Sequence, residues 1–314
     1  MSTILTIVAP IFALIALGFA AARWKWISPA GFRGLNDFVY WLATPALLFA
    51  GGIAAEEGSA GGVVAAFFGA AIPLFLLAVA LGRRLFALPL AEASLFALGA
   101  TFGNTVMLGI PVVMAAYGQA GLSLLLGIIA LHSILLLPLA TVLVEIGRAG
   151  RARVGWVARA TAAALLRNPI VMAVLAALMV RAVGLPVPEA VLRLCQMLGA
   201  ATPPVALFCL GASLAGVAAA GAALREAAAA VAVKMAAMPA LAWGLALLFG
   251  LGALETAVAV TAAALPTGAN PFILAKRYRL GEQRAGAAVL AATVVSVGVL
   301  GALLVHFRAL LGGG

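Results

Sequence analysis

Charged residues are scarce in this chain. Only 9% of its 314 residues are Asp, Glu, Lys or Arg, whereas 66% are apolar. A soluble domain carries roughly 25% charged residues, and no polar stretch here is longer than about 25 residues. The composition therefore excludes a soluble protein and leaves no room for a separate soluble domain. It predicts an all-α bundle embedded in a lipid bilayer.

The motifs of several functional classes are also missing. The sequence has no G-x-S-x-G or H-E-x-x-H motif, no P-loop pattern and no cluster of metal-ligating residues. Its apolar runs hold no pair of acidic residues of the kind that proton antiporters use. We therefore expect no enzyme activity, no metal or cofactor, and no direct use of ATP. The two cysteines, Cys195 and Cys209, lie about 21 Å apart along one predicted helix, too far to pair.

Ten apolar runs are each long enough to cross roughly 30 Å of hydrocarbon as a helix. They cover residues 3–22, 34–54, 61–81, 92–117, 121–144, 168–185, 191–217, 227–251, 254–275 and 285–306. If the N-terminus is outside, 15 of the 19 basic residues face the cytoplasm and three face outward. This positive-inside distribution predicts that both termini lie outside. It explains the net charge of +10 by topology and anionic headgroups rather than by nucleic-acid binding.

The second half of the chain repeats the first. The offsets between matching segments, in chain order, are 159, 158, 166 and 166 residues. The matches are Pro10-Ile11 with Pro169-Ile170, Ala43-Thr44-Pro45 with Ala201-Thr202-Pro203, Ala70-Ala71-Ile72-Pro73 with Ala236-Ala237-Met238-Pro239, and Asn104 with Asn270. Five spans per half predict an inverted repeat, typical of secondary transporters. We expect residues 1–147 and 168–314 to be the repeats and 148–167 a cytoplasmic linker.

The fourth and ninth spans are built to break. The fourth contains Gly99–Pro111 and the ninth Ala264–Pro271, each combining proline, glycine and an asparagine. Proline removes a helical hydrogen bond and disfavours the α conformation before it. Because irregular backbone in a bilayer must be buried in protein or line a cavity, we expect the two breaks to cross. The half-helix N-termini would then favour an anion. Alternatively, the prolines only kink the helices.

These residues resemble a known family. Four segments, in this order, are similar to those of the auxin efflux carriers and their bacterial members. They are Asn104-Thr-Val-Met-Leu-Gly-Ile-Pro111, Tyr117-Gly118, the Pro266–Pro271 cluster and Lys276-Arg-Tyr278. The resemblance covers almost the whole chain. It implies a scaffold of helices 1, 2, 6 and 7, a transport domain of helices 3–5 and 8–10, a homodimer, elevator-type movement and a bacterial inner membrane. It also implies small organic anions as substrates, such as auxin, malonate or malate.

The sequence differs from the pattern of the plant carriers in two places. Loop 145–167 is short where plant carriers have a long hydrophilic loop, so regulation by phosphorylation there is not expected. Residues 61–80 carry no charge, whereas plant members have a charged pair in this span.

The candidate site follows from the breaks and the resemblance together. The family places the substrate carboxylate near two asparagines, matched here by Asn104 and Asn270, and near a polar residue of the fifth span, matched by His132. Their neighbours complete the expected substrate site: Gly103, Thr105, Gly268 and Ala269. The residues expected to form the crossover are Gly109, Pro111, Pro266 and Pro271.

Each of these side chains has a structural alternative. The asparagines could be helix-packing amides, and His132 a neutral histidine bonded to Ser133 or a carbonyl. Lys234 could compensate substrate charge or stand where a relative holds Na⁺, or it could extend to the cytoplasmic interface. Thr44 and Thr202, each before a proline, are expected to kink their helices, with the hydroxyls bonding the freed carbonyls.

The sequence thus predicts a secondary carrier of mono- or dicarboxylates that works by alternating access. One rival is a cation-coupled carrier of the bile-acid or antiporter-like fold, driven by Na⁺ or H⁺ with a different substrate. The other is a membrane sensor or enzyme, against which the missing output domain and catalytic motifs count.

Overall fold

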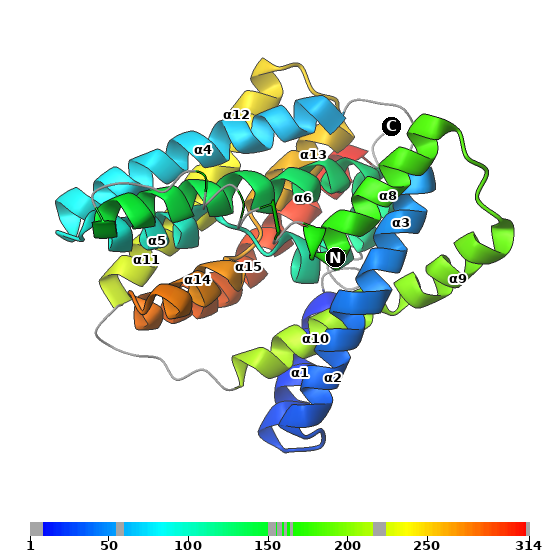
Figure 1. The fold of residues 1–314 in the computed structure, drawn as a ribbon, viewed down its shortest axis with the longest axis horizontal. Coiled ribbons are helices and arrows are strands. Elements are labelled where there is room, and N and C mark those ends of the chain that lie inside the picture. The colour runs from blue at the N-terminus through cyan, green and yellow to red at the C-terminus, as the bar shows by residue number, and fades with distance from the viewer. Residues whose placement is uncertain are drawn as a thin grey trace. The chain divides into compact units, whose positions relative to one another are not determined.

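The computed structural model describes residues 9–54, 60–149, 155, 159, 162–163, 166–215 and 224–311. These residues form helices, with one isolated β-bridge and no longer strand, which confirms the predicted all-α class for this part of the chain (Figure 1). Most of the expected linker 148–167 lies outside the described residues.

The helices follow the order of the predicted spans. The first half contains α1 (Ala9–Arg23), α2 (Pro29–Phe38), η2 (Val39–Ala43), α3 (Thr44–Ala54), α4 (Ala60–Leu85), α5 (Leu90–Thr101), η3 (Thr105–Gly109) and α6 (Ile110–Ala149). The second half contains α8 (Pro169–Val183), α9 (Glu189–Ala200), α10 (Thr202–Leu214), α11 (Leu224–Ala232), η5 (Val233–Ala237), α12 (Met238–Leu248), α13 (Ala253–Ala263), α14 (Asn270–Tyr278) and α15 (Glu282–Leu311). The η segments are π-helical turns, and α6 breaks at Gly118, whose φ is 65°.

In the described part of the chain, a proline follows each of the three π-helical turns. Pro45, Pro111 and Pro239 each follow the end of a π segment by two residues. Because a proline has no N–H, one carbonyl of the preceding turn loses its helical partner. At η2 and η5 the residue before the proline donates instead to the carbonyl five positions back, Thr44 N to Val39 O and Met238 N to Val233 O. The wider π-helical turn thus lets the helix continue past the proline.

Six described helical segments are long and apolar enough to cross a membrane. They are Pro29–Ala54, Ala60–Leu85, Thr105–Arg148, Glu189–Ser213, Leu224–Leu248 and Glu282–Leu311. The apolar helices Ala9–Arg23, Leu90–Thr101, Pro169–Val183 and Ala253–Ala263 are shorter. Two of these, α5 and α13, are the first halves of the spans expected to break. The protein is therefore a multi-pass membrane protein, and the count of ten spans stays a prediction.

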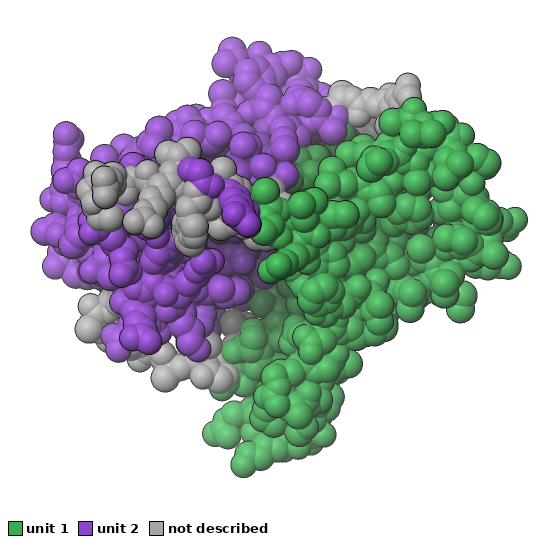
Figure 2. Space-filling model, viewed as in Figure 1, with its two compact units in different colours: residues 1–59, 106–130, 162–216 green, residues 60–105, 131–161, 217–314 purple. Residues whose placement is uncertain are grey.

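The chain divides into two compact units, coloured separately in Figure 2. Unit 1 comprises residues 1–59, 106–130 and 162–216. Within it α1 packs on α10 and α3 packs on α8. The α1–α10 contact is so close that a Cβ added at Gly211 would lie 1.8 Å from the carbonyl oxygen of Ile15. Small residues let membrane helices approach in this way.

The hydroxyls of Thr44 and Thr202, both in unit 1, are buried without a hydrogen-bond partner among the described residues. The expectation that they bond freed carbonyls is wrong. At Thr44 the π-helical turn shifts the backbone bonding, because Thr44 N donates to Val39 O. At Thr202 no carbonyl is freed, because Pro203 stands in the first turn of α10, where a backbone N–H has no helical partner anyway.

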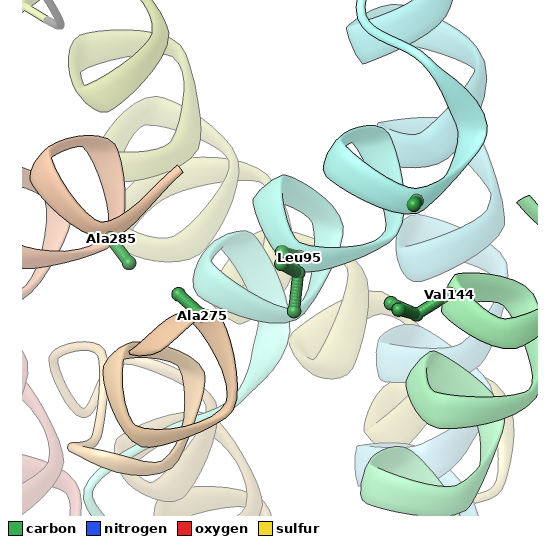
Figure 3. Close-up of a cluster of buried hydrophobic side chains, with 5 residues drawn as sticks. Leu95, Val144, Ala275 and Ala285 are labelled. Atoms are coloured by element: carbon green, nitrogen blue, oxygen red, sulfur yellow. The ribbon is translucent and has the colours of Figure 1, made fainter. Parts of the chain in front are cut away.

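Unit 2 comprises residues 60–105, 131–161 and 217–314 and holds most of the candidate site residues. One of its apolar clusters joins α5, α6, α14 and α15, and Figure 3 shows Leu95 between Ala275 and Val144. Polar bonds border this cluster. Arg284 pairs with Glu92 at 3.1 Å, and the Tyr278 hydroxyl donates to Glu145 at 2.8 Å. The apolar cluster and these two polar bonds together connect parts of both interrupted helices within unit 2.

Candidate functional site

Two unwound segments of unit 2 lie side by side. One follows α5 and includes residues 102–104; the other follows α13 and includes residues 266–268. The backbone N–H of Asn104 donates to the Pro266 carbonyl at 2.7 Å, and that of Gly268 donates to the Phe102 carbonyl at 2.9 Å. These bonds form an antiparallel bridge between Gly103 and Thr267. Each segment therefore satisfies backbone groups that the other leaves unpaired, which permits unwound backbone at this depth.

A side-chain bond strengthens this pairing. The hydroxyl of Thr267 donates to the Gly99 carbonyl, 2.7 Å away, near the C-terminal end of α5. Thr267 is 1% exposed, so its hydroxyl has no access to bulk water and depends on this acceptor.

Of the two glycines where the segments touch, Gly268 has the less space for a side chain. A Cβ added at Gly268 would lie 3.2 Å from the Gly103 carbonyl oxygen and 3.3 Å from a ring carbon of Phe102. A Cβ at Gly103 would lie 3.4 Å from Nζ of Lys234. The first contact is with backbone that cannot move freely, whereas the second is ordinary van der Waals contact with a side chain.

Asn104 and Asn270 flank the bridge. Asn104 precedes η3, and Asn270 is the first residue of α14. Both side chains are half-buried, and Ala269 is exposed, whereas the bridge itself is buried. An amide at the start of a helix can donate to an anion together with the free N–H groups of the first turn. Pro271 stands in that first turn of α14, where its missing N–H does no harm.

His132 is enclosed by aromatic rings. Its imidazole stacks on Phe102 with 4.1 Å between ring centroids and meets Phe67 edge-on at 5.5 Å. Nδ1 lies 3.2 Å from the hydroxyl oxygen of Thr105, so the partner is neither Ser133 nor a backbone carbonyl. Nε2 is buried and has no partner among the described residues. The ring thus contacts residues on both sides of Asn104 and keeps one nitrogen available.

Lys234 is fully buried in η5. Its ammonium donates to the Ala263 carbonyl at 2.5 Å and contacts the Met238 sulfur at 3.4 Å. The expectation that it extends to the interface is therefore wrong, because the side chain is buried. No carboxylate lies within ion-pair distance of it among the described residues. When protonated, Lys234 would make the site electropositive.

The remaining predicted residues are placed as follows. Pro266 accepts a bridge hydrogen bond. Gly109 and Pro111 belong to unit 1, where Gly109 ends η3 and Pro111 is the second residue of α6. No cluster of three or more metal-ligating side chains occurs among the described residues.

Sequence reasoning missed the roles of Thr267, Ala263 and Phe67. Thr267 had a usable signal, because it matches Thr101 at the same offset of 166 residues as the two asparagines. The other two had none.

The chain is similar to known membrane proteins over most of its length. Residues 3–302 match the model of a family described as "Membrane transport protein". A protein of Rhizobium meliloti (strain 1021) named "Putative malonate transporter" is 27% identical over 320 residues. That alignment covers 98% of this chain and 97% of the relative.

Proposed function

We propose that this protein is a secondary transporter of small organic anions. The premise is that the chain belongs to the membrane transport protein family, which comprises the auxin efflux carriers that its sequence resembles. The observation that carries the proposal is the bridge between residues 102–104 and 266–268 inside unit 2. The two helix interruptions lie together, and a new helical segment begins beside an asparagine after each of them. This arrangement favours an anion site over two separate kinks.

The proposed substrate is a mono- or dicarboxylate. Asn104 and Asn270 would donate amide N–H groups to the carboxylate, and the N-termini of η3 and α14 would add partial positive charge. His132 would donate from Nε2, which has no described partner, and Lys234 would compensate the substrate's negative charge. Gly103, Thr105, Gly268 and Ala269 would complete the substrate site around these groups. The name of the R. meliloti relative supports malonate as the first anion to test.

The proposed mechanism is elevator-type alternating access in a bacterial inner membrane by a homodimer with both termini outside. Ten spans would form an inverted repeat, with helices 1, 2, 6 and 7 as the scaffold. The packing of α1 on α10 and of α3 on α8 supports this arrangement, because each pair joins the first helix of one repeat to the second helix of the other. The transport domain would carry the bridge with it.

The test is uptake of ¹⁴C-malonate by the purified protein in liposomes. We expect Asn104→Ala and Asn270→Ala each to lower counterflow exchange at least tenfold. The matched control is Asn36→Ala in α2, whose amide donates to the Phe32 carbonyl four residues back and to no other group among the described residues. If both site variants exchange malonate as fast as wild type, the site assignment is wrong.

The second candidate function is a cation-coupled carrier with a different substrate. Binding of a ligand raises the melting temperature by mass action, so a thermal-shift screen of organic acids with and without Na⁺ separates the two. Stabilisation that needs Na⁺ would favour the cation-coupled carrier.

A further inference from the structure

The two halves of unit 2 differ at one equivalent carbonyl. Ala97 and Ala263 are related by the offset of 166 residues, as are Thr101 and Thr267. In the first half, the Thr101 hydroxyl donates to the Ala97 carbonyl of its own helix at 2.8 Å. In the second half, Thr267 donates across the bridge to Gly99 instead. The Ala263 carbonyl, which therefore has no bond from the Thr267 hydroxyl, accepts a hydrogen bond from Lys234.

Lys234 therefore binds the negative end of α13, where a helix favours a cation. Broken helices of secondary transporters bind coupled ions at such C-terminal ends. The first half has the apolar Phe68 at the position equivalent to Lys234. Nζ lies 3.4 Å from the position that a Cβ on Gly103 would take, so Lys234 lies beside the first unwound segment as well as at the end of α13. The Lys234 side chain thus lies at a helix C-terminal end, the kind of position where other secondary transporters bind a coupled ion.

Among the residues that the structure describes, no carboxylate balances the charge of this ammonium. Its partners, a carbonyl and a thioether, are neutral, and η5 packs against α4, α5, α11, α12 and α15. The titratable side chains on these helices and on the neighbouring α6 and α13 are Arg83, Arg84, Glu92, Tyr117, His132, Glu145, Arg148, Arg225, Glu226, Glu255, Glu282, Arg284, His306 and Arg308. Glu92 pairs with Arg284 instead.

A buried cation without a counter-ion is unfavourable, and a lysine in that position releases its proton readily. A carboxylate bound at the bridge supplies the missing counter-ion. We propose that Lys234 binds the proton that is carried together with the organic anion. This inference rests on the proposed function. The free amine takes one proton from the side on which the anion binds, and the ammonium returns it to the side on which the anion leaves. No other bond forms or breaks.

The first test measures proton uptake on binding. Malonate is added to the purified protein in a weakly buffered detergent solution that contains a pH indicator. We expect wild type to take up about one proton per bound malonate. Lys234→Met has no amine, and Lys234→Arg is always charged, so neither should take up a proton. The matched control is Lys25→Met, at an exposed lysine of unit 1, which should behave as wild type.

The second test separates exchange from net transport in liposomes. Lys234→Arg keeps the charge, so it should still exchange malonate for malonate. Without malonate it cannot lose the charge, so net uptake driven by a pH gradient should fall at least tenfold. A lysine that only caps α13 predicts equal losses in both modes. This comparison within one variant does not depend on how well Lys234→Met folds.

Three results would overturn the inference. One is a wild-type malonate flux without a proton flux; another is proton uptake by Lys234→Met equal to that of wild type. The third is net uptake by Lys234→Arg at the wild-type rate. If wild type carries malonate in neither mode while remaining folded, the proposed function fails, and this inference fails with it.

Discussion

Gly268→Ala should break the contact between the two unwound segments. The added methyl group would lie 3.2 Å from the Gly103 carbonyl oxygen and 3.3 Å from the Phe102 ring. Gly268 does not have a positive φ, so alanine is allowed there by backbone conformation, and the effect arises from lack of space alone. The two unwound segments must separate by a few tenths of an ångström to admit the methyl group.

The expected cost follows from what the separation disturbs. Overpacking a tight site costs about 1–3 kcal/mol. Weakening the buried bond from Gly268 N to Phe102 O adds to this, because an unpaired buried backbone group costs about 1–3 kcal/mol. We therefore expect Gly268→Ala to lower the free energy of unfolding by about 2–4 kcal/mol and to impair malonate transport.

The same substitution four residues from the bridge provides the control. Gly99 lies within α5, and a Cβ there would meet nothing within 4 Å. Gly99→Ala should therefore be neutral or stabilise the protein by up to about 1 kcal/mol. Denaturant titration in detergent micelles measures both variants. If Gly268→Ala is as stable and as active as Gly99→Ala, the close contact between the segments is refuted.

Two further predictions concern hydroxyl groups of unit 2. Thr267→Val should destabilise the protein by about 1–2 kcal/mol in the same titration, because the Gly99 carbonyl loses its donor. Thr101→Val should cost less, because the Ala97 carbonyl still accepts the helical N–H of residue 101; equal costs would contradict this difference. Burial and the bond to Glu145 raise the pKa of Tyr278, beyond the ninth predicted span, to about 12. Since the neutral phenol is the form favoured by folding, its stabilisation is present below pH 10 and is lost as the pH rises through 12. The difference in absorbance titration between wild type and Tyr278→Phe measures that pKa, and a value near 10 would contradict the buried bond.

The sequence predicted the class of protein and the positions of the two interruptions, because hydropathy and proline chemistry act over short stretches of chain. It did not predict which groups would pair. The bond from Thr267 to Gly99 joins residues 168 positions apart, and such a partner is set by packing. For Lys234 the sequence left burial and exposure equally open, since hydropathy does not show which face of a helix meets protein. For Thr44 the sequence did not show the π-helical turn that precedes Pro45.

The bridge also constrains the order in which the protein can be completed. Asn104 donates to Pro266, and Phe102 accepts from Gly268, so more than half of the chain must be synthesised between the two partners. At typical translation rates the first interruption therefore waits roughly 10–30 s for its partner. During that time its backbone groups depend on water, lipid headgroups or the insertion machinery. The emergence of residues 266–268 is thus the earliest moment at which the binding site can exist.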